Sequence, residues 1–281
     1  MTITRPSGKS VGMNASVLLG LAVALLCSSN ALADVARDVR DGRQDLGTPD
    51  GGFIEFGPRL SYSSIPIEGA DSGSVDFHVG GYYRFKRFFL DVSQNSHNRV
   101  QLGYNAYSSP LWSIDVLGAS SEGGIDNRIS DELADIDDRR PGLIMGLRGT
   151  IYSGPLIAQF EALADVEGLH DGFMMTGSIA RNWLVRNWNA HAIIGARYYS
   201  AGYTDYIFGV DEDEASDRFP AYTAGASITY VTEIGMSYPL SEYLVLSNTL
   251  RYWALSDSIK RSPLLTDDDY TEIATALVFV F

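Results

Sequence analysis

The segment VDFHVGGYYR, residues Val75–Arg84, alternates between two kinds of side chain. Its odd-numbered positions hold valine, phenylalanine, valine, glycine and tyrosine, whereas its even-numbered positions include aspartate, histidine and arginine. Successive residues of a β-strand point to opposite faces, so this pattern predicts a strand with one apolar face and one polar face. The alternation recurs at residues 156–165, 188–199 and 244–255, where Asn248 interrupts the apolar face. The chain is therefore predicted to be all-β.

Twelve such segments follow one another, and the links between them alternate in length. Short links (FK, YSSP, SG, NWLVRN and PLSE) follow the even-numbered segments, whereas most links after the odd-numbered segments are long and polar. Short turns at one end and long loops at the other are typical of outer-membrane barrels with an even number of strands. We therefore predict a transmembrane up-and-down antiparallel β-barrel over residues 53–281, with short periplasmic turns and longer outer loops. The expected strands lie near residues 53–62, 75–84, 87–92, 99–106, 111–119, 142–152, 155–165, 173–181, 188–199, 231–238, 243–255 and 272–281.

Residues 1–33 have the layout of a secretory signal peptide. Arg5 and Lys9 form a basic start, an apolar run covers residues 15–26, and small residues end the segment at Ala33. The apolar run is shorter than the roughly 20 residues that span a bilayer, so cleavage after Ala33 is expected rather than a permanent anchor. Cleavage would remove Cys27, the single cysteine, which excludes disulfides and thiolate metal sites from the mature chain. Residues 34–52 are predicted to form a polar periplasmic extension.

Composition and motifs argue against nucleic-acid binding and catalysis. The formal net charge of −14 opposes nucleic-acid phosphates. The chain contains no G-x-S-x-G, H-E-x-x-H or P-loop motif. His97 and His170 fall in predicted loops, where turn formation explains the residues around His170. The acidic run DEDEASD at residues 211–217 lacks the spacing of a calcium loop and is interpreted as solvated. We predict no enzyme, no cofactor and no metal site.

The polar faces of the predicted strands would line the barrel interior. Every strong base on these faces is an arginine, whose rigid fork can hold a carboxylate with two hydrogen bonds. A barrel of about eight strands is filled by side chains, whereas 16 to 18 strands leave a wide channel. For a barrel of twelve strands, both interpretations of the interior are possible, a structural ion-pair network and a narrow channel. The small diameter of such a barrel favours the network. The candidate interior charges are Glu55, Arg59, Asp76, Arg84, Asp115, Arg148, Glu161, Arg197, Glu233 and Arg251.

Aromatic residues flank the predicted short turns, which is typical of a girdle at a membrane interface. The girdle residues are Tyr82, Tyr83, Phe85, Phe88, Tyr104, Tyr107, Trp112, Tyr152, Trp183, Trp188, Tyr238 and Tyr243. The last predicted strand, TEIATALVFVF, carries Phe279 and Phe281 at alternate positions. It resembles the signal that the bacterial outer-membrane assembly machinery reads, so these two residues are candidates for that role.

The stretch TDYIFGVDEDEASDRFPAYTAGAS resembles the MipA/OmpV family (MltA-interacting protein family) of Gram-negative outer-membrane proteins. The family pattern runs Y-x-x-x-Y-F-G-V and then P-A-Y-x-A-G, with Ile207 here in place of the second aromatic. DVEGLHDG at residues 165–172 is similar to the family's D-V-x-G-x-H-x-G. The matching positions, which we interpret as structural residues of an outer loop, are Tyr203, Phe208, Gly209, Val210, Pro220, Ala221, Tyr222 and Gly225.

The resemblance implies an architecture more than a mechanism. One member of the family is described as a scaffold that joins a lytic transglycosylase to a peptidoglycan synthase, and no catalytic residues come with the family. The expected partners are outer-membrane lipid, lipopolysaccharide, the assembly machinery and a periplasmic murein hydrolase or synthase. A scaffold or interaction protein is thus the leading hypothesis. A narrow channel for ions or small solutes is the alternative, and a lipid-modifying enzyme is the third.

Overall fold

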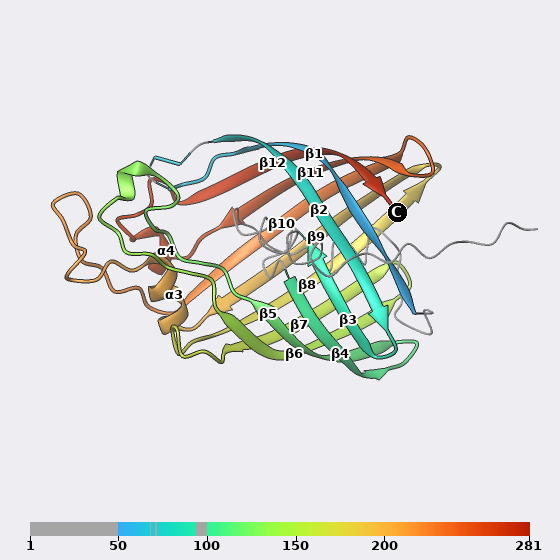
Figure 1. The fold of residues 1–281 in the computed structure, drawn as a ribbon, viewed down its shortest axis with the longest axis horizontal. Coiled ribbons are helices and arrows are strands. Elements are labelled where there is room, and N and C mark those ends of the chain that lie inside the picture. The colour runs from blue at the N-terminus through green and yellow to red at the C-terminus, as the bar shows by residue number, and fades with distance from the viewer. Residues whose placement is uncertain (1–49, 68, 71, 94–99) are drawn as a thin grey trace, which may run out of the picture.

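A computed structural model describes residues 50–67, 69–70, 72–93 and 100–281. Twelve antiparallel strands form a closed barrel in which each strand pairs with the next and β12 pairs with β1 (Figure 1). The strands are β1 (Gly51–Ser63), β2 (Gly73–Phe85), β3 (Phe88–Ser93), β4 (Val100–Ser108), β5 (Trp112–Ser120), β6 (Leu143–Ser153), β7 (Leu156–Asp165), β8 (Phe173–Val185), β9 (Trp188–Tyr199), β10 (Ser227–Pro239), β11 (Leu244–Ala254) and β12 (Asp269–Val280). The helices are η1 (Asp131–Leu133), α3 (Ala201–Phe208) and α4 (Asp257–Lys260). Among the described residues, no helix is long and apolar enough to cross a bilayer.

The predicted barrel and its twelve strands are confirmed, and the boundaries differ in a few places. β8 continues to Val185, because its ladder with β9 extends to the pair Val185–Trp188, and the link is therefore two residues long. β10 begins at Ser227, four residues before the predicted start. Gly51 and Gly52, assigned to the extension, already belong to β1, and the rest of the predicted signal peptide and extension, apart from Asp50, lies outside the described residues.

The two ends of the barrel differ in the length of their connections. Two-residue turns join β2 to β3, β6 to β7 and β8 to β9, and their first residues Lys86, Gly154 and Arg186 adopt positive φ. The long connections gather at the opposite end with α3 and α4 (Figure 1). β1 starts and β12 finishes at the short-turn end, where the backbones of Ile54 and Phe281 exchange hydrogen bonds of 3.0 and 2.9 Å.

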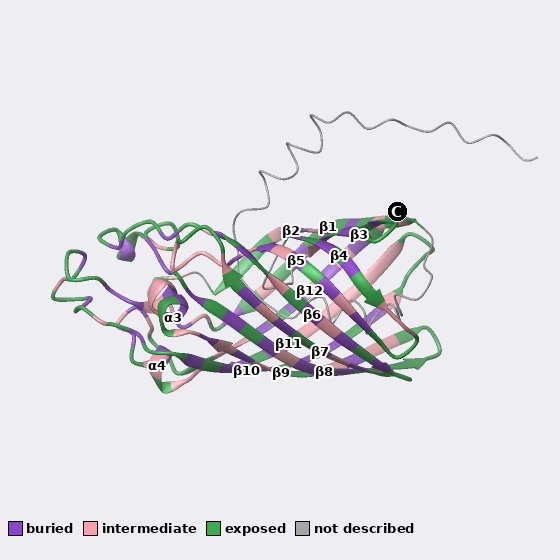
Figure 2. Cartoon of the chain, turned by 90° about the horizontal axis from the view of Figure 1, so that it is seen from below, coloured by how far each residue is buried: buried purple, intermediate pink, exposed green. Residues whose placement is uncertain are grey.

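The outward face of the wall is apolar. Buried and exposed residues alternate along the strands (Figure 2), and β10 alternates at every position from Ser227 to Met236. Outward residues such as Leu147, Ile194 and Ile234 are 55, 68 and 57% exposed. A continuous apolar band of this kind is stable when hydrocarbon surrounds it. Asn248 on β11 is a polar residue on this outward face. Its Oδ1 accepts a hydrogen bond of 2.9 Å from the hydroxyl of Thr275 on the neighbouring strand β12, so its polar side chain is satisfied locally.

Most of the predicted girdle lies on this outward face near the short turns. Pairs of rings pack side by side there, including Trp188 with Tyr238 at 4.7 Å between centroids. Two predictions were wrong: Tyr82 and Tyr152 point inward. Tyr82 shares the inner face of β2 with Arg84 and stacks on Phe89, and Tyr152 is 4% exposed. Their positions in the alternation decide this, since nearness to a turn says nothing about which face a residue occupies.

Candidate functional site

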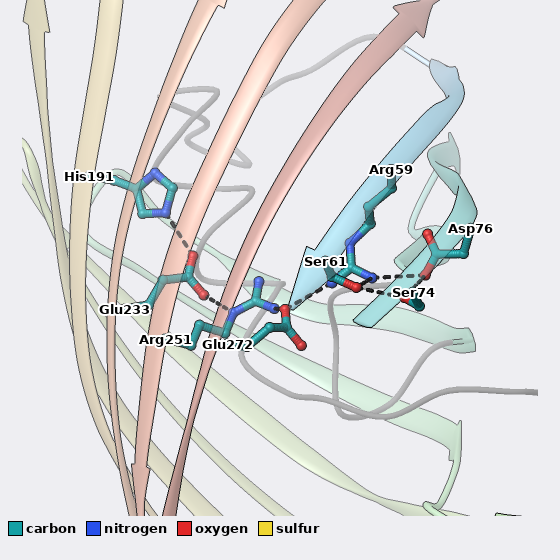
Figure 3. A network of polar contacts seen from close by, with 8 residues as sticks. All are labelled: Arg59, Ser61, Ser74, Asp76, His191, Glu233, Arg251 and Glu272. Atoms are coloured by element: carbon teal, nitrogen blue, oxygen red, sulfur yellow. Dashed lines mark hydrogen bonds and ion pairs between the residues drawn. The ribbon is translucent and has the colours of Figure 1, made fainter. Parts of the chain in front are cut away.

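The barrel interior holds a chain of ion pairs between neighbouring strands. Arg251 on β11 lies opposite Glu233 on β10 and opposite Glu272 on β12. Its Nε donates to Glu233 Oε2, and its Nη1 donates to Glu272 Oε1 at 3.2 Å. His191 on β9 contacts the other oxygen of Glu233 at 2.7 Å. The three pairs thus link four consecutive strands (Figure 3).

The same chain crosses the seam between β12 and β1. Arg59 Nη2 donates to Glu272 Oε1 at 2.8 Å, and Arg59 Nη1 donates to Asp76 Oδ2 at 3.0 Å. The hydroxyls of Ser61 and Ser74, which lie 2.7 Å apart, complete the group (Figure 3). Because Glu272 receives an arginine from each side, the closing seam is held by side-chain ion pairs as well as by backbone hydrogen bonds.

A second network braces the opposite wall, from β4 to β7. Arg148 on β6 lies opposite Asp115 on β5 and Glu161 on β7. Its Nε donates to Asp115 Oδ2 at 3.1 Å, and its Nη1 lies 3.8 Å from Glu161 Oε1. Gln101 on β4 accepts from Arg148 at 3.2 Å, and Asn105 donates to Asp115 at 2.7 Å. The amides of Gln101 and Asn105 were missed in the sequence, although their inward positions in the alternation could have identified them.

The other predicted interior charges also lie on the inner face. Glu55 and His78 approach each other to 3.2 Å across β1 and β2. Arg197 donates to the Tyr199 hydroxyl at 3.1 Å, and Arg84 donates to the Lys86 carbonyl at 3.2 Å. The structure thus places the ten predicted charges on one inner surface and joins most of them pairwise.

These charges are almost completely removed from solvent. Glu233, Arg251 and Asp115 are 0, 1 and 1% exposed. A buried charge is tolerated when an opposite charge and hydrogen bonds satisfy it, and removal of one partner is strongly destabilising. The partners of these three side chains meet this condition, so we interpret their contacts as internal bracing. No group of three or more His, Cys, Asp or Glu side chains in the described part of the chain is arranged to hold a metal ion.

The long loops form a hydrophobic cap over one end of the barrel. Ile67 follows β1, and its backbone bridges Leu265, which precedes β12. Apolar residues from the links after β5 and β9 join them in a single cluster. The cap cluster consists of Ile125, Leu133, Ile136, Val210, Phe219 and Leu264, with Ile67, Phe208 and Leu265 packed against it.

A buried ion pair ties two of these loops together. Arg139 binds both carboxylate oxygens of Glu214 at 3.0 and 2.8 Å, and it donates to the carbonyls of Ile125 and Gly209 at 2.7 and 3.1 Å. Burial raises the pKa of Glu214, whereas the positive charge and the hydrogen bonds of Arg139 act to lower it. Burial also acts to raise the pKa of Asp126, but hydrogen bonds from Arg128 and the Arg139 backbone outweigh it and lower that pKa. The interpretation of residues 211–217 as wholly solvated was therefore wrong at Glu214, which is 8% exposed.

The first part of the family motif forms α3, which packs into the mouth of the barrel. Tyr203 is fully buried between Tyr199, at 4.9 Å between ring centroids, and His170, at 4.4 Å. A β-carbon on Gly172 would lie 2.7 Å from the Tyr203 nitrogen, so this glycine allows the loop to approach the helix. The motif DVEGLHDG, through His170 and Gly172, thus packs directly against the motif that begins at Tyr203.

The rest of the motif joins the loops to one another. Val210 and Tyr222 exchange two backbone hydrogen bonds of 2.9 Å. The Tyr222 hydroxyl donates to the Ser258 carbonyl at 2.6 Å, and the Ser258 hydroxyl donates to the Gly225 carbonyl at 2.8 Å, which links this loop to α4. Gly209 lies against Asp205, where a β-carbon would come within 2.5 Å of the Asp205 carbonyl oxygen. Pro220 and Ala221 are exposed.

The last residues of the chain form an aromatic group on the outside of the barrel. Phe56 lies 5.5 Å from Phe281 and 6.1 Å from Phe279, between ring centroids. Tyr243 stacks on Phe281 at 6.2 Å. These contacts connect β1, β12 and the β10–β11 turn at the short-turn end.

Comparison with known proteins agrees with this architecture. The model of the family described as MltA-interacting protein MipA matches residues 56–281. The chain belongs to this family. It is 28% identical over 87 residues to the outer membrane protein OmpV of Vibrio cholerae serotype O1, which covers 31% of this chain and 34% of that protein. It is 25% identical over 123 residues to the putative outer membrane protein YiaT of Escherichia coli K12, which covers 43% of this chain and 50% of that protein.

The chain thus matches only about a third to a half of the length of these relatives. Among solved structures, the NanC porin aligns with a TM-score of 0.41 and 7% identity, covering 80% of this chain and 98% of that chain. The outer membrane channel DcaP of Acinetobacter baumannii aligns with a TM-score of 0.39 and 8% identity, covering 82% of this chain and 98% of that chain. The family match and the closed barrel together identify an outer-membrane β-barrel of the MipA family.

Proposed function

We propose that this protein is a non-enzymatic interaction protein of the outer membrane that holds a periplasmic murein hydrolase or synthase near the membrane. The interior ion pairs are the observation that carries the proposal. They place most of the predicted interior charges in contacts between strands, and the long loops pack against one another at one end, so we assign the partner to an external surface. The family description, MltA-interacting protein, supports a protein partner of this class.

The short-turn end is the surface we assign to this partner. Short turns face the periplasm in outer-membrane barrels. Leu111, Leu184 and Leu240 lie at or beside three of these turns and are 66, 72 and 52% exposed. Exposed apolar side chains near the water-facing end of a barrel are suited to contact with another protein.

Site-specific crosslinking in cells tests this assignment. A photoreactive residue at position 111, 184 or 240 should capture a murein hydrolase or synthase, identified by mass spectrometry. The same residue at Asp213, in an outer loop, is the matched control and should not capture it. Capture from position 213 alone, or no murein enzyme from any of the three short-turn positions, would contradict the proposal.

A narrow channel for ions or small solutes is the second candidate, because the inner wall carries charged side chains along most strands. In that case Arg148 and Glu161 would line the path, and their substitution would change ion selectivity. In a braced and closed interior the same substitutions change stability instead.

Export and assembly complete the proposal. We propose that residues 1–33 direct export and are removed after Ala33, and that the segment from residue 34 to residue 50, before β1, extends into the periplasm. Amino-terminal sequencing of the membrane-inserted protein should begin at Asp34. Phe279 and Phe281 are proposed as the assembly signal, so Phe281→Ala should slow insertion in a reconstituted assembly assay while the inserted barrel keeps its stability.

A further inference from the structure

The outward face of the barrel is nearly free of charge. Among the strand residues that the structure describes, Arg181 and Asp269 are the two charged residues on this face. Asp269 begins β12 at the long-loop end, where its carboxylate accepts the Tyr252 hydroxyl at 2.6 Å. Arg181 lies toward the opposite end, on the same face of β8 as Ile179 and Trp183.

The register places Arg181 at the edge of the wall. It lies opposite Leu156, the first residue of β7, and therefore beside the β6–β7 turn. Its guanidinium lies 5.1 Å from the centroid of the Trp183 ring. No carboxylate in the described part of the chain pairs with it. An arginine held on an interfacial tryptophan, at the height where lipid headgroups lie, is placed to bind a phosphate.

Three other cations occupy the same end. Lys86 and Arg87 form the β2–β3 turn, and Arg186 begins the β8–β9 turn. All three side chains are exposed, and within the described residues none of these side chains forms an ion pair, although the Asp50 carboxylate accepts the Lys86 backbone N–H at 2.6 Å. At the long-loop end most cations pair with a carboxylate, namely Arg128, Arg139, Arg140, Arg218 and Lys260, and Arg261 is the exception among the described residues there.

The positions of these cations around the wall indicate what they bind. In the closed strand order, the β2–β3 turn and the β8–β9 turn lie half the circumference apart. One protein partner would need a single contiguous patch, whereas a lipid leaflet surrounds the barrel on all sides. Cations at one height on opposite sides of the wall therefore fit a lipid surface.

We propose that the cationic rim, formed by Lys86, Arg87, Arg181 and Arg186, binds the headgroups of anionic phospholipids in the leaflet at the short-turn end. Arg181 binds the phosphate with its fork while Trp183 supports the guanidinium, and the turn cations add attraction to the negative surface. Val185, which is 63% exposed, lies next to Arg186 at the tip of the β8–β9 hairpin. This inference does not depend on the proposed protein partner.

Native mass spectrometry of the mature barrel tests the rim. The folded protein in detergent is mixed with equal amounts of dioleoyl phosphatidylglycerol and dioleoyl phosphatidylcholine, and the bound lipids are counted. The wild type should retain phosphatidylglycerol preferentially. Arg181→Gln should weaken this preference about fivefold, and substitution of all four cations by Gln roughly 600-fold, because each cation near an anionic surface contributes a factor of about five. Arg181→Lys keeps the charge and should retain part of the preference.

A matched control removes four cations from the other end: Arg140→Gln, Arg218→Gln, Lys260→Gln and Arg261→Gln. It changes the net charge equally and should leave the lipid preference unchanged. Equal retention of both lipids by the wild type would overturn the proposal. The proposal would also be overturned if the control variant lost as much of its preference for phosphatidylglycerol as the rim variant. Each variant is first shown to be folded by its heat-dependent mobility on gels.

Discussion

Replacement of Arg251 by methionine should destabilise the barrel by about 3 kcal/mol. Removing one partner of a buried ion pair costs about 3–5 kcal/mol, because the other charge is left without compensation. Arg251 is 1% exposed and serves two carboxylates, which would place the cost at the upper end. However, His191 still contacts Glu233 at 2.7 Å and Arg59 still contacts Glu272 at 2.8 Å. These remaining contacts bring the expected cost to the lower end of the range.

The measurement is the free energy of unfolding in urea, for the barrel reconstituted in lipid vesicles and followed by tryptophan fluorescence. The paired variant Glu233→Gln with Arg251→Met removes both charges and should recover to within about 1 kcal/mol of the wild type. Arg261→Met is the matched control, because this exposed arginine at the long-loop end makes no side-chain hydrogen bond or ion pair within the described residues, and its loss should cost less than about 0.5 kcal/mol. If Arg251→Met stays within 1 kcal/mol of the wild type, or the paired variant is as unstable as the single one, the bracing interpretation is wrong.

Three further predictions concern the cap and the outer face. Arg139→Gln leaves Glu214 buried without its partner, so limited proteolysis within residues 121–142 and 200–226 should accelerate on the order of 100-fold while the barrel keeps its unfolding midpoint; Arg218→Gln, at an exposed ion pair with Glu132, should have little effect. Burial lowers the pKa of His170 below its ordinary value of 6.5, against the opposing attraction of Asp165 and Asp171. The folded protein keeps the His170 ring neutral, so the free energy of unfolding is not reduced by this group above pH 6.5. As the pH falls from 6.5 toward the lower pKa of the folded state, the unfolded chain binds a proton that the folded chain does not, and stability is lost. Urea midpoints should therefore drop between pH 8 and pH 5 by more in the wild type than in His170→Gln. Asn248→Leu with Thr275→Val removes both partners of the lipid-facing hydrogen bond together and should leave the free energy of unfolding unchanged or raised, whereas a loss above about 1 kcal/mol would show that the pair is needed.

Strand number and the inward or outward direction of side chains were accessible from the sequence, because a two-residue period fixes them locally. Arg148 and Glu161 were assigned to the inner face in this way. The contact between Arg148 and Glu161 could not be predicted in this way, because it depends on which residues of β6 and β7 lie opposite each other. Register comes from turn lengths and closure of the whole barrel, which one strand does not encode.

The cap shows the other limit of sequence reasoning. Glu214 lies in a run of acidic residues that indicates a solvated loop. Its burial depends on Arg139, 75 residues away along the chain, and no local pattern indicates that contact. The family motif marked residues 203–225 as one unit, and the contact of Tyr203 with His170 explains why a second motif accompanies it.

Single-channel recording of the purified barrel in planar lipid bilayers distinguishes a braced, capped interior from an open channel. A barrel whose interior charges are paired and whose loops form a cap should give flat current traces at voltages that leave the membrane intact. Arg148→Ala and Glu161→Ala should then leave the traces flat while the unfolding midpoint falls. Discrete conductance steps in the wild type, with an ion selectivity that shifts in these two variants, would contradict the account and identify the interior as a channel.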